Sequence, residues 1–279
     1  MKRFLTLTPA FGVILFSFSI VLAPLVLAQK EPAETPADKA TAGAELNQGA
    51  AAYRDARYEE AEDHFRKAIA ADPGLTKAHL YLATTYTQDF IPGDETPENI
   101  RVFGLATEQY NMLLAQNPKQ IEAIKGLAGL YLQMKKFDDA KLDYYKVLGL
   151  DPNDAASYCA VGVIDWNQTF QPRMEERAKL GLKPDQPLKN REVCEPLRAI
   201  NSANIAEGID NLNRALALRP DYDDAMAYLN LMYREKADLE CDAPAARAKD
   251  EKIADDWVDK TLAVKKVRAE KAKTSTPPM

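Results

Sequence analysis

Two stretches of the chain carry the same pattern of small, aromatic and proline residues at the same spacing. The pattern reads Gly49, Ala61, Phe65, Ala68 and Pro73 in one stretch, and Ala128, Ala140, Tyr144, Val147 and Pro152 in the other. Side chains three or four positions apart share one face of a helix, and a proline ends the second helix because it cannot continue the hydrogen-bond ladder. This repetition predicts stacked helical hairpins, since each hairpin buries its apolar face only against its neighbours.

The clearest unit, residues 121–154, resembles the tetratricopeptide repeat (TPR), a helix-turn-helix of about 34 residues. The resemblance rests on a small residue in the first helix, an alanine early in the second, an aromatic residue one turn later and a closing proline. It implies an all-α fold, a right-handed TPR-type helical-hairpin solenoid of about five repeats. The repeats are placed at 42–75, 76–120, 121–154, 155–222 and 223–266.

The second and fourth repeats carry helical or loop insertions. In the second, Thr96-Pro97-Glu98 predicts a helix start, with a hydroxyl cap and proline at the first helical position. The fourth contains an insert at 167–201, for which the pattern predicts a short helix over 172–180 followed by a loop. The second helix of the fifth repeat is expected at 254–265.

The first 28 residues have the composition of an export signal. A charged start, Met1-Lys2-Arg3, precedes an uncharged run from Phe4 to Ala28. We expect cleavage after Ala28, because Pro24 obstructs the earlier small-residue site. The protein is then bacterial and exported to the periplasm or cell envelope; if the segment stays uncut, it is long enough to anchor the chain in the inner membrane.

Two further segments lack the large apolar residues that a packed core needs. The composition of residues 29–41 predicts a disordered linker, and that of residues 267–279 predicts a flexible tail that is basic and rich in proline. The net charge of −6 argues against nucleic acid as a partner, since phosphate binding requires a basic face.

The sequence offers no constellation that would make this chain an enzyme. The two histidines, His64 and His79, have no cysteine or second histidine at ligand spacing, so we expect no metal and no cofactor. No catalytic residue is assigned. The alternative is an enzyme or small-ligand binder that uses the charged side chains of the insert, namely Arg173, Glu175, Glu176, Arg177 and Lys183.

Three cysteines in an exported chain permit a disulfide bond. We hypothesise that Cys194 pairs with Cys241, which would tie the insert to the C-terminal repeat. Cys159 would then be buried and free.

The TPR resemblance also assigns a binding surface, since in this family the first helices of successive repeats line a concave groove. The matching positions are Leu46, Ala50, Tyr53, Leu80, Thr84, Lys125, Gly129, Leu132, Cys159, Val163, Trp166 and Leu231. This mostly apolar set suits a protein or peptide partner anchored by hydrophobic side chains, with Tyr53 and Trp166 at its energetic centre. The alternative is that the inserts fill the groove, which would make these residues core. A membrane-tethered component of envelope assembly is a second interpretation of the whole chain.

Overall fold

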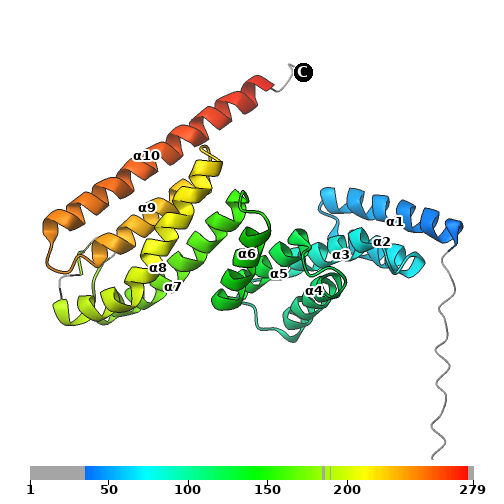
Figure 1. Cartoon of the computed structure of the whole chain (residues 1–279), viewed down its shortest axis with the longest axis horizontal. Helices are drawn as coiled ribbons and strands as arrows, with labels where there is room; N and C mark the ends of the chain where they lie inside the picture. The colour runs from blue at the N-terminus through cyan, green and yellow to red at the C-terminus, as the bar shows by residue number, and fades with distance from the viewer. Residues whose placement is uncertain (1–34, 184–185, 189, 276–279) are drawn as a thin grey trace, which may run out of the picture. The chain divides into compact units, whose positions relative to one another are not determined.

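Every regular element in the described part of the chain is an α-helix. The computed structural model describes residues 35–183, 186–188 and 190–275. Its ten helices (Figure 1) are α1 (Pro36–Arg54), α2 (Tyr58–Ala71), α3 (Thr76–Asp89), α4 (Pro97–Gln116), α5 (Ile121–Gln133), α6 (Phe137–Leu150), α7 (Ala155–Lys179), α8 (Arg191–Leu218), α9 (Asp223–Asp238) and α10 (Pro244–Ser275).

The helices pack in consecutive pairs. The first helices α1, α3, α5, α7 and α9 each lie against the second helix that follows, α2, α4, α6, α8 or α10. Each second helix except the last then contacts the first helix of the next pair. First helices also touch one another, α1 with α3, α3 with α5 and α7 with α9. This arrangement confirms the all-α array of about five helical hairpins.

Small residues allow the two helices of a pair to approach closely. A Cβ atom placed on Gly49 of α1 would lie 2.6 Å from the ring of Phe65 in α2. One on Gly162 of α7 would lie 2.5 Å from Leu212 in α8. Separations this short are sterically forbidden, so the small residue of the pattern is a packing requirement.

The insertion in the second repeat ends in a capped helix, as predicted. Thr96 is the N-cap of α4, where its side chain accepts a hydrogen bond from the backbone N–H of Asn99, and Pro97 is the first helical residue. The Asn99 amide donates to the carbonyl oxygens of Ile91 (2.8 Å) and Asp94 (2.6 Å). These bonds fold the preceding loop back onto α4.

The insert at 167–201 is mostly helical, which corrects the expectation of a short separate helix and a long loop. It extends α7 to Lys179 and starts α8 at Arg191, so the connection between these helices is short. Pro172 and Pro196 lie inside α7 and α8. Each proline removes one backbone hydrogen bond, and the close packing of α7 on α8 keeps the helices continuous.

Both ends of the array are more helical than composition suggested. α1 begins at Pro36, inside the linker predicted for 29–41. α10 begins at Pro244, ahead of the expected 254–265, and continues through residues 267–275 of the predicted tail. Alanine, lysine and glutamate have high helix propensity, and the packing of α10 on α9 provides the nucleus from which the helix extends.

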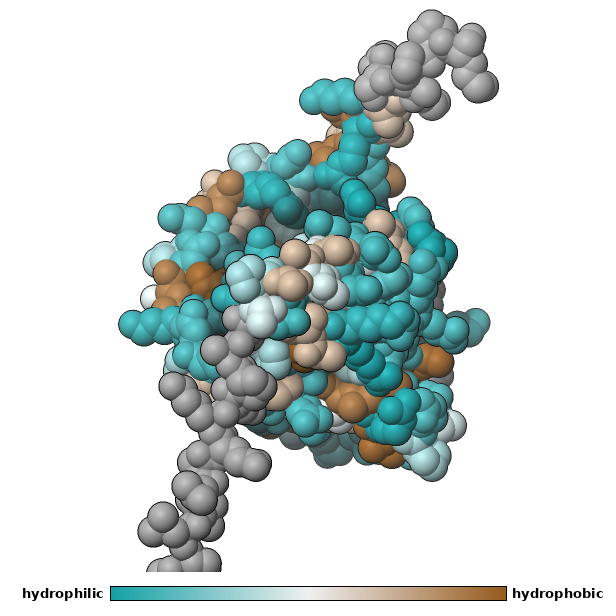
Figure 2. All heavy atoms as spheres, turned by 90° about the vertical axis from the view of Figure 1, so that its right-hand side faces the viewer, coloured by the Kyte–Doolittle hydropathy of each residue, from teal (hydrophilic) through white to brown (hydrophobic). Residues whose placement is uncertain are grey.

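The predicted signal segment 1–28, its cleavage point and residues 276–279 lie outside the described residues. Over the part of the chain that the structure does describe, none of the helices has the length and apolar character required to cross a bilayer. Seen from the side that carries α1 and α2, the surface is mostly hydrophilic, with small, separate hydrophobic areas (Figure 2).

Candidate functional site

The predicted groove residues all lie on first helices. Apart from Cys159, each is half-buried, being neither fully exposed nor enclosed in the core. The structure distributes them over several packing clusters: Leu46 and Tyr53 border one, Leu80 the next, Leu132 a third, and Val163 with Trp166 a fourth. They therefore line the array along its length, and do not converge on a single pocket.

Tyr53 lies at the α1 end of this surface. Its ring packs against that of Tyr58, with centroids 5.5 Å apart, and burial raises the pKa of its hydroxyl. Thr84, on α3, donates its hydroxyl to the carbonyl oxygen of Leu80 at 2.8 Å. Because that hydroxyl is already bonded within its own helix, the α3 portion of the surface is largely apolar in character.

Lys125, the single cation among the predicted residues, forms an ion pair with Asp154. Asp154 is the N-cap of α7 and accepts hydrogen bonds from the backbone N–H groups of Ala156 (2.9 Å) and Ser157 (3.1 Å). Burial acts to raise the pKa of Asp154, but the hydrogen bonds from Lys125 and these backbone groups lower it overall. The charge of Lys125 is thus compensated within the fold, so it does not present an uncompensated cation to a partner's carboxylate.

Trp166 belongs partly to the core. Its ring centroid lies 4.7 Å from that of Phe170 on α7 and 5.6 Å from that of Tyr228 on α9. Its Nε1 is buried without a hydrogen-bond partner among the described residues. Trp166 therefore joins α7 to α9, and only the part of its ring that stays accessible is able to meet a partner.

Cys159 is buried and free. Burial raises the pKa of its thiol to about 11, although a hydrogen bond from Tyr222 opposes the shift. A thiol that stays protonated is a poor nucleophile. Cys159 is therefore a core residue and does not contribute to the groove surface.

The two histidines connect neighbouring elements. Nδ1 of His64 lies 2.6 Å from Oε2 of Glu45, which links α2 to α1. His79 lies with Nδ1 2.8 Å from Oε1 of Gln109 and Nε2 3.0 Å from the carbonyl oxygen of Pro73. Across residues 35–183, 186–188 and 190–275, no three His, Cys, Asp or Glu side chains are grouped so that they could hold a metal ion.

A disulfide bond joins Cys194 to Cys241, the two cysteines paired by the sequence hypothesis. It attaches the start of α8, within the insert, to the turn that follows α9. The sulfur of Cys194 also lies 3.6 Å from the carbonyl oxygen of Asp238. The insert is therefore covalently fixed to the last repeat.

Asp238 is the centre of a buried ionic cluster beside this disulfide. Its Oδ2 accepts from Arg173 (2.5 Å) and Arg177 (2.8 Å), and its Oδ1 accepts from Arg247 (2.9 Å). Arg173 also pairs with Glu235 at 2.7 Å. Burial raises the pKa of Glu235 to about 7, against the opposing charge of Arg173.

Two of the charged insert residues considered for ligand binding are thus engaged in the fold. Arg177 is 1% exposed and donates additionally to the carbonyl oxygen of Gln186 at 2.7 Å. The two arginines stand out in the sequence of the insert, but their acidic partners, Glu235 and Asp238 in α9, do not. The spacing of Arg173 and Arg177, one helical turn apart, shows that both side chains lie on one face of α7, but it does not identify the carboxylate that they share.

A second buried polar group, also unforeseen, lies between α6, α7 and α8. Nζ of Lys141 lies 2.6 Å from Oδ1 of Asp165 and 2.8 Å from Oε2 of Glu207. Burial raises the pKa of Asp165 to about 7, although the hydrogen bond from Lys141 acts to lower it. This group ties three consecutive helices together.

Comparison with known proteins agrees with this geometry. The family profile described as Tetratricopeptide repeat matches residues 126–154, which include the end of α5 and all of α6. The solved structure "MamA 41-end from Desulfovibrio magneticus RS-1" is similar with a TM-score of 0.52 and 14% identity, over 81% of this chain and 96% of that one. "Crystal structure of MamA" is similar with a TM-score of 0.50 and 14% identity, over 80% and 96% of the two chains. At these identities the likeness concerns the fold alone.

Among curated proteins, none matches the sequence. The fold and its repeated packing define a helical-hairpin solenoid of the kind that presents an extended surface to partners. Within that class, the matched profile assigns residues 126–154 to the tetratricopeptide repeat, and the other hairpins pack on one another in the same consecutive way.

Proposed function

We propose that this protein is a non-catalytic protein–protein interaction scaffold of the bacterial cell envelope, which binds a partner segment along its first helices. The observation that carries the proposal is the half-buried, mostly apolar row from Leu46 to Leu231, which occurs on all five first helices. Half-buried apolar side chains bind a partner at low cost, because they are already held in place by their neighbours.

The chemistry of this row favours a segment anchored by hydrophobic side chains. Leu46, Tyr53, Leu80 and Leu132 supply apolar contact area, and Lys125 is already paired with Asp154. A partner recognised through a free C-terminal carboxylate would need uncompensated cations at these positions. An extended or helical peptide with apolar residues at regular spacing is the better fit.

The disulfide between Cys194 and Cys241 supports an exported location, because such bonds persist in oxidising compartments. Determining the N-terminal residue of protein purified from its native envelope tests this part of the proposal. A mature N-terminus at Gln29 indicates a released periplasmic protein. An intact Met1 indicates the membrane-tethered alternative, and a reduced protein confined to the cytoplasm contradicts both.

The groove is tested by a matched pair of substitutions. Leu80→Asp places a carboxylate on the predicted binding surface, whereas Leu142→Asp changes a residue of α6 that is 58% exposed. We expect the first to reduce co-purification of the partner at least tenfold and the second to leave it unchanged, with similar thermal transitions for both. Equal partner recovery for both variants would contradict the groove.

Trp166→Ala separates binding from packing. If Trp166 contributes mainly to the partner surface, the substitution weakens capture and leaves the thermal transition close to that of the wild type. If the contacts of its ring with Phe170 and Tyr228 dominate, the transition falls by several degrees. In that event Trp166 is a core residue, and the binding surface is confined to the repeats before it.

A further inference from the structure

The C-terminal end of α10 is a basic, exposed helix on an acidic protein. The chain carries a net charge of −6, yet the stretch from Lys260 to Ala272 contains a single carboxylate, Glu270. Its cations are Lys260, Lys265, Lys266, Arg268 and Lys271. All residues from 265 to 272 are exposed. This end of the helix therefore differs in charge from the rest of the molecule.

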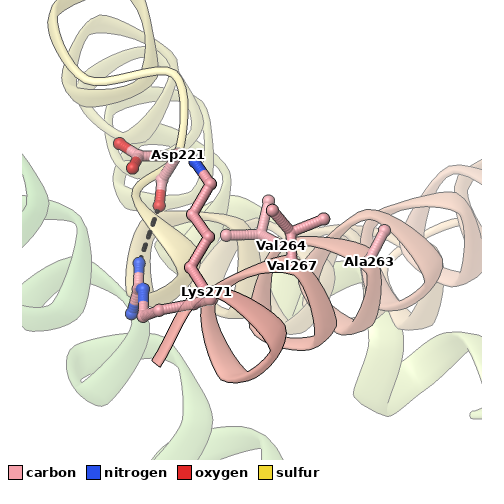
Figure 3. A pocket seen from close by; sticks show the side chains of 6 residues that line it. Asp221, Ala263, Val264, Val267 and Lys271 are labelled. Atoms are coloured by element: carbon pink, nitrogen blue, oxygen red, sulfur yellow. Dashed lines mark hydrogen bonds between the residues drawn. The ribbon is translucent and has the colours of Figure 1, made fainter. Parts of the chain in front are cut away.

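An apolar hollow runs along one face of this helix end. Ala263, Val264 and Val267 form its floor, and Figure 3 shows them in succession on α10. The hollow has a volume of about 320 Å³, and Val267 is 50% exposed. Lys260 and Lys271 fall on the same helical face, since positions spaced by three, four, seven and eleven residues are aligned. The apolar floor is thus flanked by a lysine at each end.

Two of the surrounding cations are held in place by the fold. Arg268 donates to Oδ1 of Asp223 (3.0 Å) and to the carbonyl oxygen of Asp221 (3.2 Å), leaving other guanidinium N–H groups for a ligand. Nζ of Lys260 lies 3.8 Å from the ring centroid of Trp257. Lys271 reaches across the hollow toward Asp221, the one carboxylate that lines it (Figure 3). Fixed cations around an apolar floor form a preorganised surface.

We propose that this face of α10 binds an acidic segment of a partner protein, with one aliphatic side chain in the hollow and flanking carboxylates beside Lys260 and Arg268. From Lys260 to Lys271 the helix rises about 16 Å, at about 1.5 Å per residue. About five residues of extended peptide cover that length. The charge and the shape of the surface together specify this occupant.

An anionic membrane surface is the competing partner, and the arrangement of apolar residues disfavours it. Leu262 and Val267 are 60% and 50% exposed, but five positions apart on a helix they point in different directions. A helix that lies on a bilayer gathers large apolar side chains on one face, usually with an aromatic anchor. The stretch from 260 to 272 contains no aromatic residue.

The test uses the full mature chain and the synthetic peptide Glu-Glu-Leu-Asp-Glu, followed by fluorescence anisotropy at low and high salt. We expect binding that weakens at least tenfold when the leucine is replaced by serine, when the acids are replaced by amides, or when salt screens the charges. Val267→Asp and the double variant Lys260→Glu/Arg268→Glu should each weaken binding at least tenfold. The matched control, Lys249→Glu/Lys252→Glu, makes the same charge change nearer the start of α10 and should alter binding less than twofold.

Several results would overturn the proposal. Equal weakening by the control pair would mean that only the overall charge matters. If Val267→Asp binds the peptide as tightly as the wild type, the hollow does not take part in the interaction. Tight binding to phosphatidylglycerol vesicles with none to the peptide would assign the surface to lipid, and salt-sensitive dimerisation in sedimentation would assign it to a second copy. The Leu80→Asp experiment is independent of all these outcomes, so the proposed groove and this second surface fail separately.

Discussion

The first six helices and the last four are held together by different kinds of contact. From α1 to α6 the buried side chains are almost entirely apolar, and the buried polar residues number four: His79, Thr85, Asn99 and Asp143. Among the described residues from α7 to α10 there are eleven buried polar residues. The most enclosed of these include Asp165, Arg177 and Glu235. The regular repeats are therefore stabilised mainly by the packing of apolar side chains. The extended repeats are stabilised in addition by buried ion pairs and a disulfide bond.

This difference follows from the length of the helices in the two regions. In a regular repeat the two helices bury each other along their whole length. α7 and α8 extend beyond the repeat pattern, and the start of α8 shares an apolar cluster with the end of α9 through Cys194, Leu197 and Leu239. The contacts of Arg173 and Arg177 with Asp238, together with the disulfide from Cys194 to Cys241, attach the extra turns of α7 and α8 to the last repeat.

The largest expected effect follows from removing the centre of the ionic cluster. Asp238→Ala leaves three arginines without their shared carboxylate, and an unpaired buried charge costs about 3–5 kcal/mol. Urea unfolding followed by circular dichroism measures the loss. Asp242→Ala, which removes an exposed carboxylate four residues later, is the control and should have little effect. Comparable stability of the two variants would show that the cluster does not hold the extension in place.

Reducing the disulfide is expected to have the next largest effect. The bond closes a loop with a sequence separation of 47 residues, and its loss should cost about 2–4 kcal/mol. Hydrogen exchange should then increase at the start of α8 and around 239–243, while α1 to α6 keep their protection. Cys159→Ser, which leaves the bond intact, is the matched control. If reduction exposes α1 to α6 equally, the whole array opens as one unit and the two regions are not energetically distinct.

Local patterns were sufficient to predict the regular region and parts of the extended one. The spacing from Gly49 to Pro73 and from Ala128 to Pro152 depends on contacts within one hairpin, so it is visible in the sequence. The Thr96 cap is local for the same reason. The partners of Arg173 and Arg177 lie more than 60 positions away, at Asp238, and no local rule selects them. Their pairing depends on how α9 packs on α7.

For the candidate binding surface too, the sequence predicted local features and missed contacts between hairpins. Register within the repeat placed every predicted groove residue on a first helix, because register is a local property. It did not reveal that Lys125 is neutralised by Asp154, since that contact depends on the next hairpin. Composition predicted a flexible tail where α10 continues, because helix extension depends on the nucleus that tertiary packing provides.

The pH dependence of stability distinguishes the two regions by a smaller effect. Burial gives Asp165 a pKa of about 7 in the folded protein, above the ordinary value of 3.8. Between these values the folded state holds the proton more tightly than the unfolded state, so the contribution of Asp165 to stability is present at low pH and is lost as the pH rises toward 7. Asp165→Asn should remove this dependence, and the wild type should lose up to about 3 kcal/mol relative to the variant between pH 5 and pH 8.

Chemical unfolding of both proteins across this range measures that difference. A constant difference between wild type and Asp165→Asn would mean that Asp165 is ionised throughout, with Lys141 fully compensating its charge. Any remaining pH dependence of the extended region would then come from Glu235, whose pKa burial also raises to about 7. The measurement thus tests whether buried charge, and not burial alone, separates the two regions.

The smallest expected change in stability comes from substitutions in the regular region, and it tests whether close packing between helices stabilises that region. Gly49→Ala introduces a methyl group 2.6 Å from the ring of Phe65, and overpacking of this kind costs about 1–3 kcal/mol. Gly43→Ala in the same helix has no atom within 4 Å of the new methyl group, so it should stabilise α1 by about 0.5–1 kcal/mol. Thermal unfolding of the two variants should therefore shift in opposite directions. If both raise the transition temperature, Phe65 moves aside at little cost, and close approach at Gly49 is not what holds the first hairpin together.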